Sequence, residues 1–185
     1  MSAIRLALIA ALLLAGTPRA APEDAGLRAR VDGLLGSFRP VSVEQWRSLG
    51  SEAAPVLESI ARDGRALPTR RARALAALGV LRPSAARPLV KELASDRTAP
   101  PVLRSAAVDA APSVLGTESV SFLAPFLHDG DAAVRRRSAE ALAATGPTGC
   151  RVVLKEPQPA SASDPLARTR AGCTEQLRTS PSSER

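Results

Sequence analysis

Apolar residues recur at the spacing of a helix in three short segments of the chain, 54–63, 87–96 and 120–129. In each segment they stand at positions i, i+1 and i+4, which places them in one stripe on a helix. The aligned residues are Val56, Leu57 and Ile60, then Leu89, Val90 and Leu93, then Phe122, Leu123 and Phe126. Each segment closes on an aspartate, and these evenly spaced aspartates are Asp63, Asp96 and Asp129. The pattern predicts three copies of one helix.

An Ala-rich stretch follows each segment and predicts a second helix, because Ala is the strongest helix former. The three stretches are 70–79, 104–111 and 137–146. Gly79 and Gly146 stand where C-cap glycines are expected. Asp109 and Pro112 fall in the second of these helices, so we expect it to be kinked or to end early. A pair of such helices cannot bury its apolar stripe alone and must stack on further copies.

The third unit carries the fullest motif. Residues 126–142 read FLHDGDAAVRRRSAEAL: the end of a leucine-rich first helix, an Asp in the turn, and Val-Arg opening an Ala-rich helix. This motif resembles HEAT repeats, in particular the short bacterial HEAT-like repeats also found in phycobilin lyases. The resemblance covers about residues 46–146 and implies an all-α fold, an α-α superhelix built as a short HEAT-like solenoid of three to four helix pairs. The implied units are about 42–81, 82–116 and 117–146. Such arrays serve many unrelated roles, so the resemblance specifies the fold rather than the function.

The same resemblance implies a ladder of hydrogen bonds between units, formed by the turn Asp and the Arg six residues after it. Asp129 and Arg135 take these places in the third unit. The first two units carry Thr or Val at the Arg position, so Arg70 or Arg104 could serve there only with a shifted register.

Residues 23–41 precede the repeats and are predicted to cap them. A helix over 23–35 is amphipathic; its apolar face consists of Leu27, Val31, Leu34 and Leu35. Ser42, followed three residues later by Gln45, is a capping box that opens the first repeat. We interpret Trp46, which follows directly, as a packing residue rather than a ligand platform.

Residues 147–179 are predicted to form a degenerate fourth pair. Its short first helix spans 150–155, and Asp164 with the following proline opens a second helix that runs to about Arg178. The polar tail 180–185 is predicted to be disordered.

Residues 1–20 have the features of a secretory signal peptide. Arg5 is followed by an apolar run of ten residues, 6–15, which is too short for a membrane-spanning helix of about 20 residues. We expect cleavage after Ala20, no transmembrane segment in the mature chain, and a periplasmic or secreted protein. Thr17 occupies the place of a lipobox Cys, which argues against a lipoprotein. An apolar N-terminal helix packed on the domain is the alternative.

Export would place Cys150 and Cys173 in an oxidising compartment, where an even number of cysteines favours a disulfide. Their separation along the chain suits a bridge between neighbouring helices. Two free buried thiols are the alternative. With no His nearby the pair cannot form a tetrahedral zinc site, and we predict no metal site and no cofactor.

The net charge of +7 comes almost wholly from arginine. Removal of Arg5 and Arg19 with the leader leaves 23 basic and 18 acidic residues, a net charge of +5, which is ordinary for a soluble domain. One hypothesis is a basic stripe on the second helices that binds an acidic partner; its members would be Arg70, Arg73, Arg104, Arg136 and Arg137. The alternative is that these arginines are solvated or pair with Glu140, Asp109 and the turn aspartates.

No catalytic residue is predicted. His128 is the only histidine, and its place before a turn is typical of a solvated residue. Asp129-Gly130-Asp131 resembles the start of a calcium loop but lacks the later glutamate, and a capped turn explains it better. We therefore expect a non-catalytic, exported scaffold or adaptor with a protein partner, acidic if the stripe binds it. The alternatives are a binder of anionic envelope polymer or lipid and a lyase-like enzyme acting on a small ligand. Nucleic acid is disfavoured by export and by the lack of a motif.

Overall fold

The computed structural model describes residues 22–159, 161 and 164–179, so the predicted signal peptide (1–20) and tail (180–185) lie outside the described residues. Every regular element in the described part is a helix, which confirms the all-α prediction. The α-helices are α1 (Pro22–Gly36), α2 (Val43–Arg47), α3 (Ala53–Arg62), α4 (Pro68–Leu81), α5 (Arg87–Ser95), α6 (Pro101–Leu115), α7 (Ser119–Leu123), α8 (Ala132–Ala144), α9 (Pro147–Lys155) and α10 (Pro165–Thr179). The 3₁₀ helices are η1 (Ser84–Ala86), η2 (Gly116–Glu118) and η3 (Ala124–His128).

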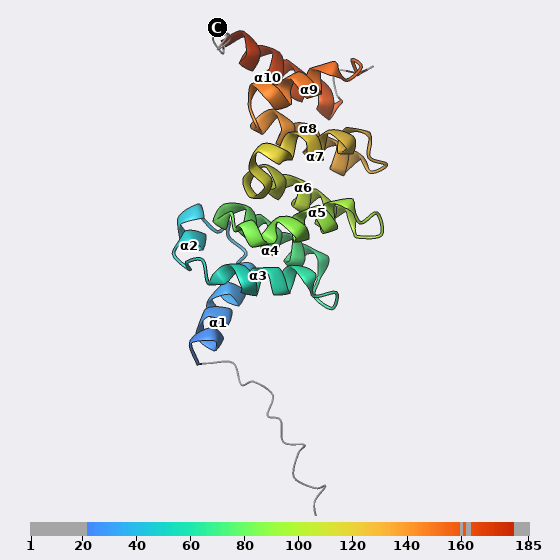
Figure 1. Ribbon diagram of the computed structural model, residues 1–185. Coiled ribbons are helices and arrows are strands. Elements are labelled where there is room, and N and C mark those ends of the chain that lie inside the picture. Colours follow the sequence, from blue (N-terminus) through green and yellow to red (C-terminus); the bar gives the residue numbers. More distant parts are fainter. Residues whose placement is uncertain (1–21, 160, 162–163, 180–185) are drawn as a thin grey trace, which may run out of the picture.

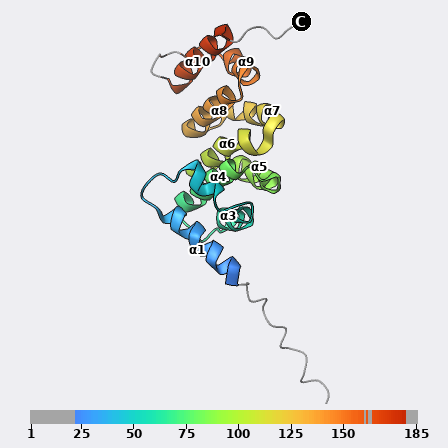
Figure 2. The ribbon, with the colours of Figure 1, turned by 90° about the vertical axis from the view of Figure 1, so that its left-hand side faces the viewer.

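The helices pack as successive pairs: α3 with α4, α5 with α6, α7 and η3 with α8, and α9 with α10. Figure 1 shows these pairs following one another along the molecule, from α1 near one end to α10 at the other. In the view turned by 90°, α3, α5 and α7 lie on one side and α4, α6 and α8 on the other (Figure 2). Because α4 contacts α6, α6 contacts α8 and α8 contacts α10, the second helices form a continuous layer.

The apolar stripes of the first helices form the core, as their spacing predicts. Their buried members are Leu57, Ile60, Leu89, Val90, Leu93, Leu123 and Phe126. Val56 and Phe122 are half-buried against this core. Burial of each such side chain contributes about 1.5–3 kcal/mol before the conformational entropy is subtracted.

The prediction that Gly79 caps a helix is wrong. The helix α4 continues to Leu81, and its C-cap is Arg82 in the left-handed conformation, with φ at 54°. Gly79 lies inside α4, where a Cβ atom would stand 3.5 Å from both Cα and Cβ of Ala110 on α6. Its lack of a side chain therefore serves the close packing of two second helices. Gly146 does follow the C-cap of α8 and has a φ of +88°, which favours glycine.

Of the two outcomes expected for the second helix of the second unit, a kink or an early end, the early end is wrong. It runs as α6 through Pro112 to Leu115. Pro112 lies in the last turn, where its missing N–H costs the helix one hydrogen bond.

The turn of the third pair is shorter than the other two. The helices α4 and α6 begin at the fifth position after Asp63 and Asp96, whereas α8 begins at the third position after Asp129. The Asp131 carboxylate makes this possible as the N-cap, because its Oδ1 accepts two backbone N–H groups of the first turn, at 2.9 and 3.1 Å. A residue of α8 therefore follows its equivalent in α6 by fewer positions than a residue of α6 follows its equivalent in α4.

The N-terminal elements follow the prediction closely. Leu27, Val31 and Leu35 of α1 are buried, and α1 packs against α3 and α4. The capping box is confirmed: Ser42 Oγ accepts the Gln45 N–H at 3.2 Å, and Gln45 Oε1 accepts the Ser42 N–H at 2.8 Å. It opens only the short helix α2, which is packed on α4.

At the other end, Cys150 of α9 and Cys173 of α10 form a disulfide, as predicted. The two helices are also joined by Arg170, whose Nη1 donates to the carbonyl oxygens of Val153 and Glu156 at 2.9 and 2.6 Å. No helix in the described part of the chain is long and apolar enough to span a membrane.

Gly149 gives a test of this terminal packing. A Cβ atom at this position would overlap the Leu142 carbonyl oxygen and the Thr145 hydroxyl, so we expect Gly149→Ala to lower the free energy of unfolding by about 1–3 kcal/mol. Gly172→Ala is the matched control, because Gly172 lies in the same helix pair with open space around it. Alanine there should stabilise α10 by up to about 1 kcal/mol. Urea unfolding of both variants measures the difference, and equal effects would contradict the packing argument.

Candidate functional site

One arginine recurs at the same place in the second helices of the first three pairs. Arg71, Arg104 and Arg135 are the fourth residues of α4, α6 and α8. Arg71 Nε donates to the Ala61 carbonyl oxygen at 2.8 Å, and Arg104 Nε to that of Ala94 at 3.3 Å. Arg135 Nη1 donates to the carbonyl oxygens of Asp129 and Gly130, at 2.8 and 3.1 Å. Ala61 and Ala94 lie in the last turn of the first helix, where carbonyls lack partners within the helix, whereas Asp129 and Gly130 lie in the turn between the helices. Each arginine thus satisfies backbone groups of its own pair.

Arg104 also connects two pairs. Its Nη1 donates to Asp129 Oδ1 at 3.0 Å, and its Nη2 donates to Asp129 Oδ2. Arg104 is only 6% exposed, and the Asp129 side chain is similarly buried. Asp129 thus bonds across a pair boundary through the preceding unit's Arg104, while Arg135 contacts the backbone of the Asp129 turn. This ion pair is bidentate and buried, so it fixes the relative orientation of the two side chains and also pairs their charges.

The pair makes stability depend on pH. The Arg104 guanidinium, as a hydrogen-bond donor, holds the pKa of Asp129 below its ordinary value, and the Asp131 backbone N–H lowers it further. A carboxyl whose pKa is lower in the folded than in the unfolded state stabilises the fold at pH values above the unfolded pKa, which is about 3.9. This contribution to stability is lost as the pH falls through the lowered pKa of the folded state. We expect the wild-type chain to lose more stability than Asp129→Asn when the pH falls below about 4. Urea unfolding across this range measures the two slopes, and parallel curves would contradict the assignment.

Arg70 and Arg73 hold the N-terminal helix on α4. Arg70 Nη2 donates to Asp32 Oδ1 of α1 at 2.5 Å. Arg73 Nη1 donates to the carbonyl oxygens of Leu35 and Ser37, at 2.9 and 3.3 Å, where α1 ends. Both side chains therefore have structural partners within the fold.

Arg136 and Arg137 are paired with carboxylates on the second-helix layer. Both lie beside Glu140 within α8, at 3.5 and 3.1 Å, and Arg137 Nε is 3.5 Å from Asp109 Oδ2 of α6. Desolvation by the surrounding protein raises the pKa of Asp109, against the opposing effect of Arg137. Each of the five arginines of the hypothetical stripe thus has at least one partner within the fold.

The residues considered for catalysis lie in an ordinary turn. His128 Nε2 is 3.3 Å from Glu156 Oε2, with most of the His128 side chain exposed. The carboxylate oxygens of Asp129 and Asp131 accept hydrogen bonds from Arg104 and from backbone N–H groups. Within the described ranges, no three His, Cys, Asp or Glu side chains are grouped so as to hold a metal ion.

The structure shows two hollows on the second-helix layer. Neither was predicted from the sequence. The first, of about 390 Å³, lies between α4 and the connection from α1 to α2, with Phe38 and Trp46 in its lining. The second, of about 310 Å³, lies between α2, α4 and α6, with Asp109 in its lining. Ala76 of α4 borders both hollows, so they adjoin. The one sequence signal for them is Phe38, an aromatic residue outside every apolar stripe.

The chain was compared with models of known protein families and with curated proteins, and neither comparison gave a match.

Proposed function

We propose that this chain is an exported, non-catalytic scaffold: a short HEAT-like solenoid that binds a partner protein through its layer of second helices. The observation that carries the proposal is the repetition of the helix pair together with its arginine. Arg71, Arg104 and Arg135 recur at the fourth position of α4, α6 and α8, and each bonds backbone carbonyls where the first helix of its pair ends or in the turn that follows. A repeated structural unit extends a surface in one direction, and such surfaces serve binding.

Two further features favour a protein partner over an anionic polymer or lipid. The arginines expected to bind an anionic surface are engaged in the fold, since Arg70, Arg104 and Arg137 each contact a carboxylate. The surface that is left combines apolar side chains with small hollows, as protein interfaces do. The disulfide between Cys150 and Cys173 supports export to the periplasm or the outside, because such bonds persist in oxidising compartments.

The proposal is tested by crosslinking in the native cell. A photo-reactive residue at Ser113 of α6, on the second-helix layer, should give a discrete protein adduct, and one at Arg65 in the α3–α4 turn should not. The mature protein should begin at Ala21 and occur in the envelope or secreted fraction. Recovery of the chain only in the cytoplasm with residues 1–20 attached would contradict export. Equal labelling at both positions, or none at Ser113, would contradict a scaffold that binds through its second helices.

A further inference from the structure

The two hollows adjoin on the second-helix layer, and together they are called the groove. Ala76 borders both, and the groove continues past Gly79 of α4 to Ala110 and Ser113 of α6. These residues have small side chains, so the backbone of a bound chain can approach the helices closely. An extended segment of polypeptide needs such close approach if its backbone is to reach the surface that binds it.

The end of the groove beside α1 is apolar. Trp46, itself buried, and half-buried Val41 line it. Phe38 stands at its edge and is fully exposed. An exposed aromatic ring beside an apolar hollow offers a large contact area to a bound segment. This end is therefore suited to hold an apolar or aromatic side chain of the bound segment.

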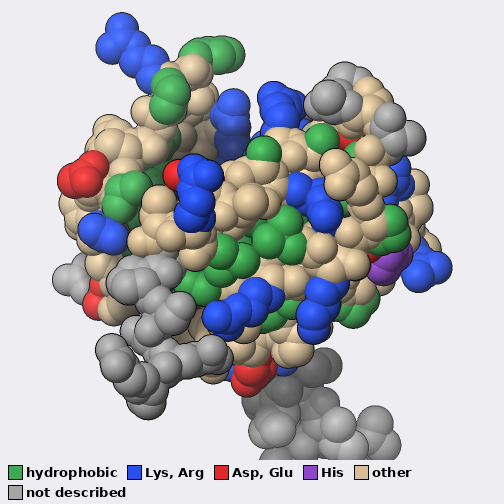
Figure 3. Space-filling model, turned by 90° about the horizontal axis from the view of Figure 1, so that it is seen from above, with side chains coloured by type: hydrophobic (Ala, Val, Ile, Leu, Met, Phe, Trp, Pro, Cys, Tyr) green, Lys and Arg blue, Asp and Glu red, His purple; other side chains and the backbone are tan. Residues whose placement is uncertain are grey.

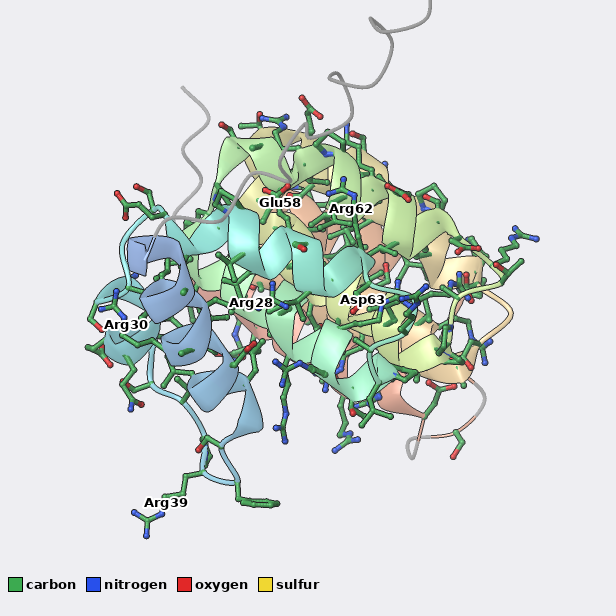
Figure 4. All side chains as sticks on the ribbon, turned by 90° about the horizontal axis from the view of Figure 1, so that it is seen from below. Arg28, Arg30, Arg39, Glu58, Arg62 and Asp63 are labelled. Carbon is green, nitrogen blue, oxygen red and sulfur yellow. A yellow bond between two sulfur atoms is a disulfide. The ribbon has the colours of Figure 1, made fainter. Side chains whose placement is uncertain are left out.

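The rim of the groove is positively charged. Arg39 and Arg73 line the first hollow, and Arg47 and Arg82 line the second. The only carboxylate in either lining is Asp109, which faces Arg137 at 3.5 Å. Arg39 projects from the tip of the α1–α2 connection, away from the helices (Figure 4). The side chains of Arg39 and Arg82 make no hydrogen bond or ion pair to any other described residue, so both are available to a ligand.

The excess of positive charge continues toward the C-terminal end. In the view from that end, Lys and Arg side chains outnumber Asp and Glu side chains on the visible surface (Figure 3). An approaching acidic segment would therefore meet a favourable field before it reached the groove.

We infer that this groove binds an extended, acidic segment of the partner protein, with an apolar or aromatic side chain in the hollow beside Phe38 and carboxylates facing Arg39 and Arg82. The inference rests on the proposed scaffold function and specifies its site and the chemistry of its ligand.

A selection of random short peptides displayed on phage, against the oxidised full chain, tests the inference. The enriched peptides should combine Asp or Glu with Phe, Trp or Leu, and their affinity should fall as salt is raised. Arg39→Glu and Ala76→Glu should each weaken the enriched peptides by about tenfold or more. Both positions are exposed, so both variants should keep their circular dichroism spectrum and melting temperature.

Arg65→Glu is the matched control, because Arg65 is likewise an exposed loop arginine whose side chain has no partner among the described residues, and it lies outside the groove. Peptides without acidic residues, or affinity equally reduced by Arg65→Glu, would overturn the inference. Tight binding to anionic phosphatidylglycerol vesicles that is lost in Arg39→Glu would also overturn the inference, because the ligand would then be a lipid surface. If a partner still crosslinks equally well to Arg39→Glu and Ala76→Glu, the groove is not the binding site, although the proposed scaffold function stands. A chain that neither crosslinks nor selects peptides would overturn both.

Discussion

Asp129→Ala is expected to lower the free energy of unfolding by about 3–5 kcal/mol, because it leaves the buried Arg104 guanidinium without its counter-charge. Both side chains of the pair are more than nine-tenths buried, so little solvent is present to replace the lost carboxylate. The variant also removes the acceptor of the Asp131 backbone N–H. Urea unfolding followed by circular dichroism measures the loss.

Asp96→Ala is the control that the repeat itself supplies. Asp96 ends the equivalent first helix of the preceding unit, but it is exposed, and its carboxylate accepts hydrogen bonds from the backbone N–H and the hydroxyl of the nearby Thr98. Its removal should cost much less than the removal of Asp129, because water can solvate the groups that Asp96 leaves. Combining Asp129→Ala with Arg104→Leu should recover part of the stability lost in Asp129→Ala, because it removes the unpaired charge as well. Equal losses in Asp96→Ala and Asp129→Ala, or no recovery in the double variant, would contradict a buried pair that joins two repeats.

The positions of the core residues could be predicted from the sequence because they obey two strict periods. A helix buries one stripe, and a repeat places equivalent stripes at a constant interval along the chain, so Leu57, Val90 and Leu123 could be aligned by inspection. All three are fully buried. The pairing of Cys150 with Cys173 was predictable for another reason: the described chain offers each cysteine no other partner.

The roles of the arginines could not be predicted in the same way. Arg104 and Arg135 are equivalent in the fold, but the turn before α8 is shorter than the turn before α6, so their spacing departs from the interval between the first helices. An arginine on an Ala-rich helix also looks the same in the sequence whether it faces solvent or a carbonyl of the neighbouring helix. Arg71 and Arg104 reach back to the preceding helix, a contact that depends on the distance between helices and not on their pattern.

The groove was beyond sequence reasoning because tertiary packing creates it. Phe38 lies in a connection without periodicity, and Ala76 and Ala110 come from different repeats. Only the position of the α1–α2 connection, which Arg73 fixes through the carbonyls of Leu35 and Ser37, brings these residues to one surface. Gly79 shows the same limit: its place near a helix end suggested a cap, whereas its contact with Ala110 explains it.

Loss of the disulfide is expected to cost about 3 kcal/mol, because the bond between Cys150 and Cys173 closes a loop in the unfolded chain. The loss should be concentrated at the end of the array, since α10 packs on α8 and α9 and nothing in the described chain follows it. Hydrogen exchange measures this locally. In the double variant Cys150→Ala with Cys173→Ala, amides of α9 and α10 should exchange markedly faster, while those of α3 and α4 should keep their protection.

Reduction of the wild-type chain separates loss of the bond from loss of the side chains. Both cysteines are buried, so alanine also removes packing, whereas a reduced thiol pair retains nearly all of it. If the constraint on the unfolded chain dominates, the reduced wild type and the double variant should show similar exchange in α10. A reduced chain that keeps the protection of the oxidised one would mean that Arg170, through its bonds to the carbonyls of Val153 and Glu156, and the packing on α8 hold the last helix in place. The disulfide would then add little to the stability of the fold. It would still indicate an oxidising compartment, but only because it forms there and not because the fold needs it.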